Sequence, residues 1–148
     1  MGELAMTEAE WGYLAGIIDG EGCISLDHRA HPILIVGNTS EALILWLRDH
    51  VAQGSVQVRS SHWNPKHKKQ WAWRLAGQKI GPLLIALLPY LVIKKAQAEL
   101  VIAVCGTIQP YHSGRGSMPR LTSEVQRLRE SHILQLRALN KRGLPLAS

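Results

Sequence analysis

The order of local structural signals is the feature that most constrains the fold of this chain. A capping-box pattern, Thr7 with Glu10 three residues later, predicts a helix that ends near residues 20–22. Thr39 or Ser40 can cap a second helix. Alternating apolar residues predict four strands, which are 23–28, 33–36, 55–61 and 70–75. Each helix signal therefore precedes a hairpin, which predicts an α+β fold with four antiparallel strands.

The rest of the chain is predicted to consist mainly of helices. A helix is expected over 79–88, and Pro89 then stands at a position suited to begin another helix that continues to residue 104. The segment 106–119 is rich in Gly, Ser and Pro and is predicted to be a loop. Thr122 or Ser123 caps a last helix that ends near Asn140.

The charge of the chain is unevenly distributed. The 148 residues carry a net charge of +6, yet residues 50–98 contain eight bases and no Asp or Glu. A surface without carboxylates suits a phosphate backbone, because a carboxylate there would repel it. A solvated basic face or an anionic protein partner would explain the same pattern.

Several protein classes are excluded by what the sequence lacks. The two Cys make neither a disulfide framework nor a zinc-binding spacing. The first residues, MGELAMTEAE, do not resemble a signal or transit peptide, and the apolar run 82–93 is too short to span a bilayer. We therefore expect an intracellular protein with no membrane association and no organic cofactor.

The first predicted helix carries an unusual stripe of small residues. Gly12, Gly16 and Gly20 recur every four residues and so lie on one helical face. Each Gly costs about 1 kcal/mol of helix stability relative to Ala. A very close contact with another helix would offset this cost, either within the chain or with a second copy of it.

The same helix ends in an acidic motif. Residues 14–22 read LAGIIDGEG, so the carboxylate of Glu21 and neighbouring carbonyls, such as that of Gly20, come at the end of the helix. Carboxylate, carbonyl, water and phosphate oxygens together suit a hard cation such as Mg²⁺. An ordinary exposed acid after a helix is the alternative interpretation of Glu21.

LAGIIDGEG closely resembles the motif of the LAGLIDADG homing endonucleases. Four further segments resemble the family in order and spacing, namely GCISL at 22–26, Gly37-Asn38-Thr39, the second hairpin GSVQVR…WAWRL, and PYLVIK at 89–94. The resemblance covers about residues 10–104. It implies the αββαββα fold, with a curved four-stranded antiparallel sheet that binds DNA and a C-terminal helix. It also implies one endonuclease domain over 1–110, with 111–148 a loop and helix packed on the same domain.

The resemblance further implies an activity. Family members cleave both strands of a long, pseudo-palindromic DNA site by metal-assisted hydrolysis, and so promote mobility of the intron or other element that encodes them. A chain with one motif would act as a homodimer, with Gly12, Gly16 and Gly20 packed against the second copy. The cofactor implied is Mg²⁺, whose site Mn²⁺ or Ca²⁺ could also occupy.

The resemblance assigns roles to particular residues. Glu21 corresponds to the metal-binding acid, with the Gly20 carbonyl as a further ligand, and Asp19 has a mainly structural role near the helix end. Lys94 matches the Lys of the PYLxxK stretch and would stabilise charge at the scissile phosphate, and Asn38 would order water at the active site. A surface Lys and a helix-capping Asn are the alternative interpretations of these last two residues.

Strand alternation predicts which side chains face DNA. We expect Ile24, Leu26, Val56, Val58, Trp71, Trp73 and Leu75 to face the core. The opposite face would then present Ser25, Asp27, Arg29, Ser55, Gln57, Arg59, Ser61, Gln70 and Arg74. Arg and Gln suit bidentate contacts with guanine and adenine. A one-residue slip would reverse the facing of the fourth strand.

Additional basic residues are candidates for contacts with the DNA backbone. The tip of the second hairpin would supply Lys66, His67, Lys68 and Lys69, and Lys95 follows the candidate catalytic Lys94. An RNA intron maturase, or a DNA-binding relative that does not cleave, would share the fold and much of this surface. Retention of Glu21 and Lys94 argues against a pure binding module, because binding alone requires neither.

Overall fold

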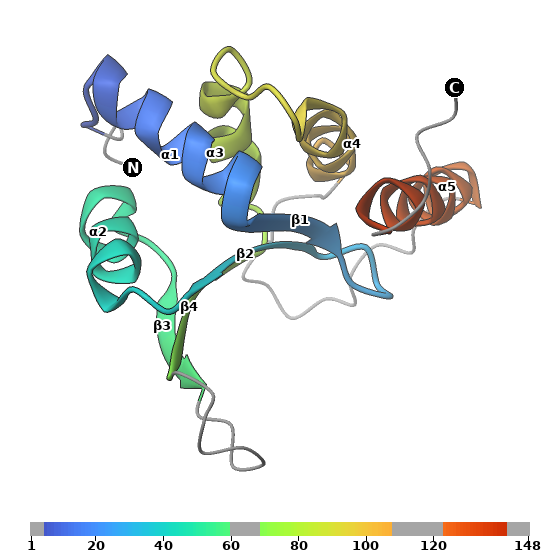
Figure 1. Ribbon diagram of the computed structural model, residues 1–148. Helices are drawn as coiled ribbons and strands as arrows, with labels where there is room; N and C mark the ends of the chain where they lie inside the picture. Colours follow the sequence, from blue (N-terminus) through green and yellow to red (C-terminus); the bar gives the residue numbers. More distant parts are fainter. Residues whose placement is uncertain (1–4, 60–68, 108–122, 142–148) are drawn as a thin grey trace, which may run out of the picture.

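The computed structural model describes residues 5–59, 69–107 and 123–141 (Figure 1). The elements follow in the order α1 (Glu8–Glu21), β1 (Gly22–Leu26), β2 (Pro32–Asn38), α2 (Glu41–Val51), β3 (Ser55–Arg59), β4 (Gln70–Ala76), α3 (Ile80–Leu87), α4 (Lys95–Cys105) and α5 (Ser123–Asn140). Thr7 and Glu10 form the predicted capping box of α1, and Ser40 caps α2. The predicted α+β fold is confirmed.

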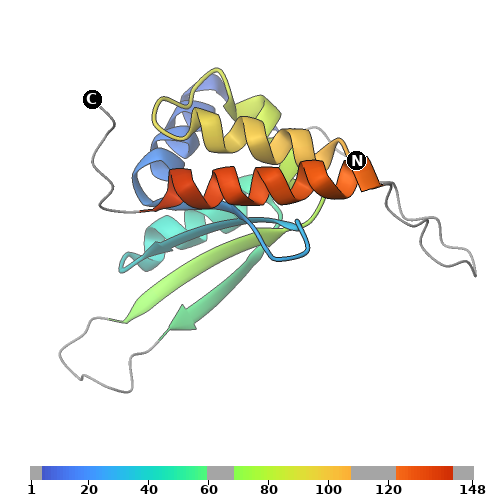
Figure 2. The ribbon, with the colours of Figure 1, turned by 90° about the vertical axis from the view of Figure 1, so that its right-hand side faces the viewer.

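The four strands form one antiparallel sheet in the order β1-β2-β4-β3. The described helices lie on one side of this curved sheet, with α1 and α2 crossing it and α5 beside β1 (Figures 1 and 2). The opposite face carries no described helix and is turned toward the lower right in Figure 1. Among the described residues, the sheet therefore has one face covered by helices and one face without such cover, called the open face below.

Strand alternation supplies the core on the covered face. Ile24, Leu34, Val36 and Trp73 are each fully buried between the sheet and the helices. Burial of a large aliphatic side chain contributes about 1.5–3 kcal/mol, so this layer provides much of the stability. Trp73 also donates a hydrogen bond from Nε1 to the carbonyl of Gln53 at 2.9 Å.

The turn between α2 and β3 is fitted closely around Trp73. Ala52 ends α2 in the left-handed conformation, and Gly54 has a φ of +94°. A Cβ on Gly54 would lie 2.6 Å from Nε1 of Trp73, so only Gly fits at this position. The Trp73 indole and the turn at 52–54 therefore hold each other in one conformation.

The C-terminal helix protects the edge of the sheet. Asn140 donates a hydrogen bond from Nδ2 to the carbonyl of Ile24 on the edge strand β1, at 2.8 Å. Ile133 and Leu136 of α5 are buried in the core, and Arg129 donates to the side chain and carbonyl of Thr107, each at 2.9 Å. Because an unprotected edge strand can pair with other chains, α5 also limits self-association through β1.

The prediction that Pro89 begins a helix is wrong. The structure has turns and bends at 88–94, and α4 begins only at Lys95. The physical reason is that the amides of 92–94 are bonded to Asp19, a residue from a distant part of the chain. A helix across this segment would compete with those bonds.

Two strand predictions also need correction. The first strand ends at Leu26 and not at residue 28, because the Asp27 side chain begins a turn by accepting backbone amides. Val58 lies on the same side of the sheet as Trp71 and Trp73, but its side chain is 47% exposed. It lies near the end of the β3–β4 hairpin, where Figure 1 shows the strands extending past the helices, and so it does not belong to the core. The facing of β4 is as predicted, with Trp73 and Leu75 buried.

No helix in the described parts of the chain combines the length and the apolar character needed to cross a membrane.

Candidate active site and nucleic-acid interface

The end of α1 delivers Glu21 to the sheet. Glu21 is the last residue of the helix, and the first strand begins with the next residue, Gly22. A Cβ on Gly22 would lie 2.9 Å from the Cα and carbonyl oxygen of Ile18, so the close turn from helix to strand requires Gly. The Glu21 side chain is left exposed beside the sheet.

Asp19 connects α1 to the segment before α4. Its carboxylate accepts hydrogen bonds from three backbone amides, those of Val92 at 2.8 Å, Ile93 at 3.1 Å and Lys94 at 2.9 Å. A carboxylate at the start of a helix is also favoured by the helix dipole of α4. Asp19 thus holds two separate helices at a fixed distance from each other.

Lys94 makes the reciprocal connection. Its Nζ donates hydrogen bonds to the carbonyls of Ile18 and Asp19, each at 2.9 Å. A cation is favourable at a helix C-terminus, where backbone carbonyls lack partners within the helix. The ammonium group therefore lies at the end of α1, two to three residues before Glu21 in the chain.

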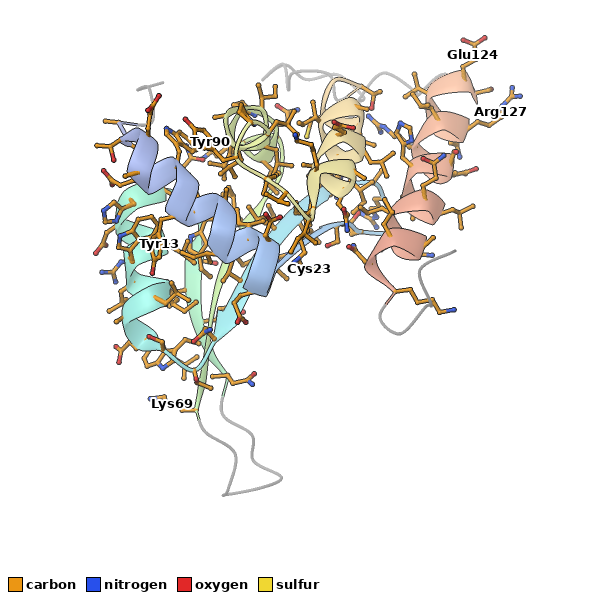
Figure 3. All side chains as sticks on the ribbon, turned by 45° about the horizontal axis from the view of Figure 1, so that its top comes forward. Tyr13, Cys23, Lys69, Tyr90, Glu124 and Arg127 are labelled. Carbon is orange, nitrogen blue, oxygen red and sulfur yellow. The ribbon has the colours of Figure 1, made fainter. Side chains whose placement is uncertain are left out.

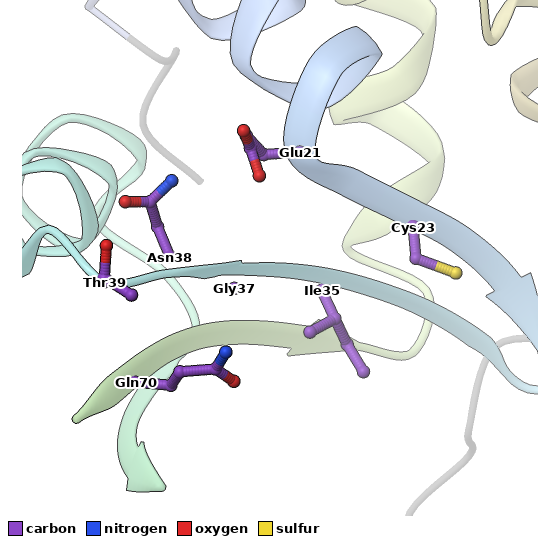
Figure 4. A pocket seen from close by; sticks show the side chains of 7 residues that line it. All are labelled: Glu21, Cys23, Ile35, Gly37, Asn38, Thr39 and Gln70. Carbon is purple, nitrogen blue, oxygen red and sulfur yellow. The ribbon is translucent and has the colours of Figure 1, made fainter. Parts of the chain in front are cut away.

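Asn38 lies across from Glu21 at the end of β2. Both residues line a polar hollow, together with Cys23, Ile35, Gly37, Thr39 and Gln70. Figure 4 shows the side chains of Glu21 and Asn38 directed toward each other across this hollow. Asn38 also accepts a hydrogen bond from the amide of Ser40 at 2.8 Å, so it helps to shape the start of α2. Lys94 is not among the residues that line the hollow.

The candidate metal ligands near Glu21, among the described residues, can supply only part of a metal site. Within the described residues, no group of three or more His, Cys, Asp and Glu side chains could hold a metal ion. One carboxylate and a helix-end carbonyl fit a hard cation whose other ligands come from water, phosphate or a second copy of the chain. The residues present are thus compatible with Mg²⁺, and insufficient for it by themselves.

The open face of the sheet groups five of the predicted DNA-contacting residues, namely Ser25, Ser55, Gln57, Gln70 and Arg74. In the strand register, Cys23, Ile35, Arg74 and Ser55 lie in one row across the sheet, and Gly37, Ala72 and Gln57 lie in the next. By alternation, this face also carries Ser25, Ile33 and Gln70. Cys23, Ile33 and Ile35 were not predicted to lie here. For Ile33 and Ile35 a sequence signal was present, because β2 is apolar at every position from 33 to 36.

The other predicted contacts lie elsewhere or outside the described residues. Arg29 is exposed in the β1–β2 turn. Lys69 places its Nζ 4.9 Å from the centre of the Trp71 ring, and so lies on the opposite side of β4 from Gln70. Lys95 is exposed at the first turn of α4. The positions outside the described structure are Ser61, Lys66, His67, Lys68 and the side chain of Arg59.

Asp27 organises the turn between β1 and β2. Its carboxylate accepts the amides of Arg29 at 2.8 Å and His31 at 2.9 Å, and Oδ2 lies 3.2 Å from Nδ1 of His31. Burial by itself would raise the pKa of Asp27, but the two amide bonds and the nearby imidazole outweigh it and lower the pKa. The carboxylate therefore faces its own turn, in which Ala30 has a φ of +61°.

One face of α1 is not covered by any described residue. A Cβ placed on Gly12, Gly16 or Gly20 would meet no atom within 4 Å. Exposed apolar side chains flank this stripe, with Tyr13 51% and Val92 83% exposed. Figure 3 shows Tyr13 on α1 beside α2, and Cys23 just beyond the end of α1. Three Gly in a helix are therefore not explained by packing within the described chain.

Comparison with known proteins gives a consistent result for structure. Neither the protein-family profiles nor the sequences of curated proteins gave a match. Solved structures do match. The homing endonuclease I-CvuI, in complex with its target in the presence of Ca, aligns over 93% of this chain and 87% of its own, with 20% identity and a TM-score of 0.67.

Two further structures extend this result. The archaeal intron-encoded homing endonuclease I-Vdi141I, complexed with DNA, aligns over 95% of this chain and 90% of its own, with 14% identity and a TM-score of 0.70. The LAGLIDADG homing endonuclease I-GzeII, in complex with a DNA target, aligns over 91% of this chain but 46% of its own, with 20% identity and a TM-score of 0.59. The present chain thus matches about half of that protein.

Proposed function

We propose that this chain, which has the fold of the LAGLIDADG homing endonucleases, is a site-specific DNA endonuclease that acts as a homodimer on long, pseudo-palindromic duplex sites. The observation that carries the proposal is the position of Glu21. Its exposed carboxylate lies where the end of α1 meets the open face of the sheet, beside Asn38 and Gln70. A group that can bind a cation is therefore adjacent to a surface suited to DNA.

The uncovered face of α1 supports the homodimer. Gly12, Gly16 and Gly20 leave room for a second helix to approach closely, and no atom of the described chain fills that space. Pairing of two such faces about a two-fold axis would also bring together the two copies of Glu21, which follows directly on Gly20. The partial donor set in one chain would then be completed by the other chain.

Residues at the end of α1 would share the chemistry. Glu21 and the carbonyl of Gly20 would hold a divalent cation, which when bound activates water and neutralises charge on the phosphate. Lys94, held by two helix-end carbonyls, adds positive charge near the scissile phosphate. Asn38, directed toward Glu21, would orient water in the hollow. The Asp19 carboxylate fixes the position of Lys94 by accepting a hydrogen bond from the Lys94 backbone amide.

The open face of the sheet would recognise the base sequence of the DNA site. A curved antiparallel sheet can enter the major groove, and Gln57, Gln70 and Arg74 are suited to bidentate contacts with purines. Backbone contacts would come from Arg29, Lys95 and the basic tip of the second hairpin, as predicted from the sequence. The biological role implied by this activity is mobility of the genetic element that encodes the protein.

Cleavage of a plasmid library of pseudo-palindromic sites with Mg²⁺ tests the proposal. The full-length protein is expected to cut a narrow set of sites on both strands. Glu21→Gln should bind the selected site with unchanged affinity but cut it at least about a thousandfold more slowly. Glu99→Gln, which removes an exposed carboxylate on α4, is the matched control and should cut normally. Equal cutting by the Glu21 variant would remove Glu21 from the mechanism.

The dimer has a separate test. Gly16→Leu should be accepted by the single chain, because a side chain there meets nothing and Leu favours helix more than Gly does. We expect the variant to be folded, to have the molar mass of a monomer and to lack cleavage. Ala138→Leu, at an exposed position on α5, serves as the control. A wild-type monomer that still cuts both strands would contradict the homodimer.

Binding and cleavage assays on duplex DNA, with intron RNA as a second substrate, separate the alternatives. A protein that binds duplex sites tightly but never cuts them with Mg²⁺ would be a non-cleaving relative. A protein that binds only intron RNA and promotes its splicing would be a maturase.

A further inference from the structure

The open face of the sheet has two chemically different zones. The first zone consists of Cys23, Ile33 and Ile35 on β1 and β2, and is apolar. The second zone consists of Ser55, Gln57, Gln70 and Arg74 on β3 and β4, and is polar. Ile35 pairs with Cys23 on one side and with Arg74 on the other, so the two zones meet along the line between β2 and β4.

The apolar zone is not explained by the described fold. Leu34 and Val36 are fully buried on the covered face, while Ile33 and Ile35 project from the opposite face and are partly exposed. A strand that is apolar on both faces is typical of a sheet covered on both sides. No described element covers this side, so an external partner is the expected cover.

The surroundings of the apolar zone favour duplex DNA as that partner. Arg74 shares a row with Ile35, and Cys23 and Ile35 line the same hollow as Glu21. The stretch 50–98, which includes β3 and β4, contains no acid. An apolar protein partner would have to tolerate the adjoining Arg74 cation, whereas the major groove offers phosphates, base edges and one apolar group, the C5-methyl of thymine.

We propose that Cys23, Ile33 and Ile35 form a thymine-selective zone, which reads C5-methyl groups within each half-site. The proposal rests on the proposed DNA endonuclease function and adds a specificity to it. Gln57, Gln70 and Arg74 would read purines by hydrogen bonds, and the apolar zone would read thymine by excluding water from its methyl group. Each half-site thus contains a stretch with thymine preference beside one with purine preference.

Replacement of thymine by 2′-deoxyuridine in the cleaved site tests this directly, because it removes only the methyl group. The experiment uses the full chain and its own selected duplex, with one thymine replaced at a time. At the positions that face the apolar zone, binding should weaken about fourfold per methyl group, the effect of losing roughly one buried CH₂. Replacement elsewhere in the site should have no effect.

Variants of the chain connect the effect to particular residues. In Ile35→Ser and Ile33→Ser, thymine and deoxyuridine sites should be bound equally at the corresponding positions, since the apolar contact is lost. Ile85→Ser is the matched control, because Ile85 is 56% exposed on α3 in the helix layer, and it should keep the wild-type preference for thymine. Thermal unfolding of each variant confirms that it is folded.

The outcomes are distinct. Loss of uridine sensitivity in the Ile35 and Ile33 variants but not in the Ile85 variant supports the zone. Equal binding of thymine and uridine sites by the wild type, or a selected site without thymine in its half-sites, overturns it while leaving the endonuclease intact. A change of molar mass in Ile35→Ser with unchanged base preference would assign the zone to a protein contact and also overturn it. Failure to bind any duplex refutes the proposed function itself.

Discussion

The two faces of the single sheet have different surroundings, although their residues alternate along the same strands. Trp73 is fully buried against the helices, and its neighbour Arg74 is exposed on the open face. Val36 and Ile35 form a second such pair on β2. Since one face is buried by the helices and the other is not, a core position and a position proposed for DNA recognition are neighbours in the sequence. Substitutions on the two faces should therefore have different consequences.

The largest expected effect is on the covered face. Trp73→Ala should lower the free energy of unfolding by about 3–5 kcal/mol, because it leaves a cavity and removes the bond to the Gln53 carbonyl. Equilibrium unfolding in urea measures this loss. Trp73→Phe keeps most of the ring and should lose less. Loss of DNA binding without loss of stability in either variant would contradict the division of roles between the faces.

The second effect concerns the connection between α1 and α4, where one substitution should lower both stability and cleavage. Asp19→Ala leaves three amides without their acceptor and should lower the free energy of unfolding by about 2–3 kcal/mol. Cleavage should fall as well, because Lys94 loses its fixed position. Urea unfolding and a cleavage assay together measure both effects. Asp49→Asn, whose carboxylate contacts only the neighbouring Arg48 among the contacts described, is the control.

Much of this organisation could be predicted from the sequence, because it depends on local signals. The capping box at Thr7, the cap at Ser40 and the alternation of Trp73 with Arg74 are all short-range patterns. The motif at 14–22 likewise predicted the fold that the solved structures share.

What could not be predicted depends on residues far apart in the chain. The bonds from 92–94 to Asp19 span more than seventy positions and override the helix signal of Pro89. The apolar zone on the open face was missed for a related reason, since an all-apolar strand such as β2 does not reveal which partner covers each face. The roles of Glu21, Asn38 and Lys94 in catalysis stay predictions, to be tested as described above.

On the open face, Arg74→Ala should affect binding and leave folding nearly unchanged. Loss of one bidentate contact with guanine should weaken specific DNA binding by about 1–2 kcal/mol, or roughly 5- to 30-fold. Stability should change by less than about 0.5 kcal/mol. Arg48→Ala on α2 removes a cation from the helix layer and is the control for total charge. Binding assays with matched and single-base-altered sites measure the effect, and a uniform loss across all sites would indicate a phosphate contact instead.

The smallest effect is expected at the β1–β2 turn, which joins the two strands of the apolar zone. The pKa of Asp27 is lower in the folded protein than its ordinary value of about 3.9, so the folded state binds this proton more weakly than the unfolded chain. The stabilisation is therefore complete above about pH 4 and is lost as the pH falls through the lower folded pKa. Asp27→Asn should be less stable than the wild type at pH 7 by about 1 kcal/mol or less, because the carboxylate is partly exposed to solvent. Urea unfolding at pH 7 and near pH 2 measures the difference, which should vanish at the lower pH. A difference that persists there would assign the effect to the geometry of the turn and not to the charge of Asp27.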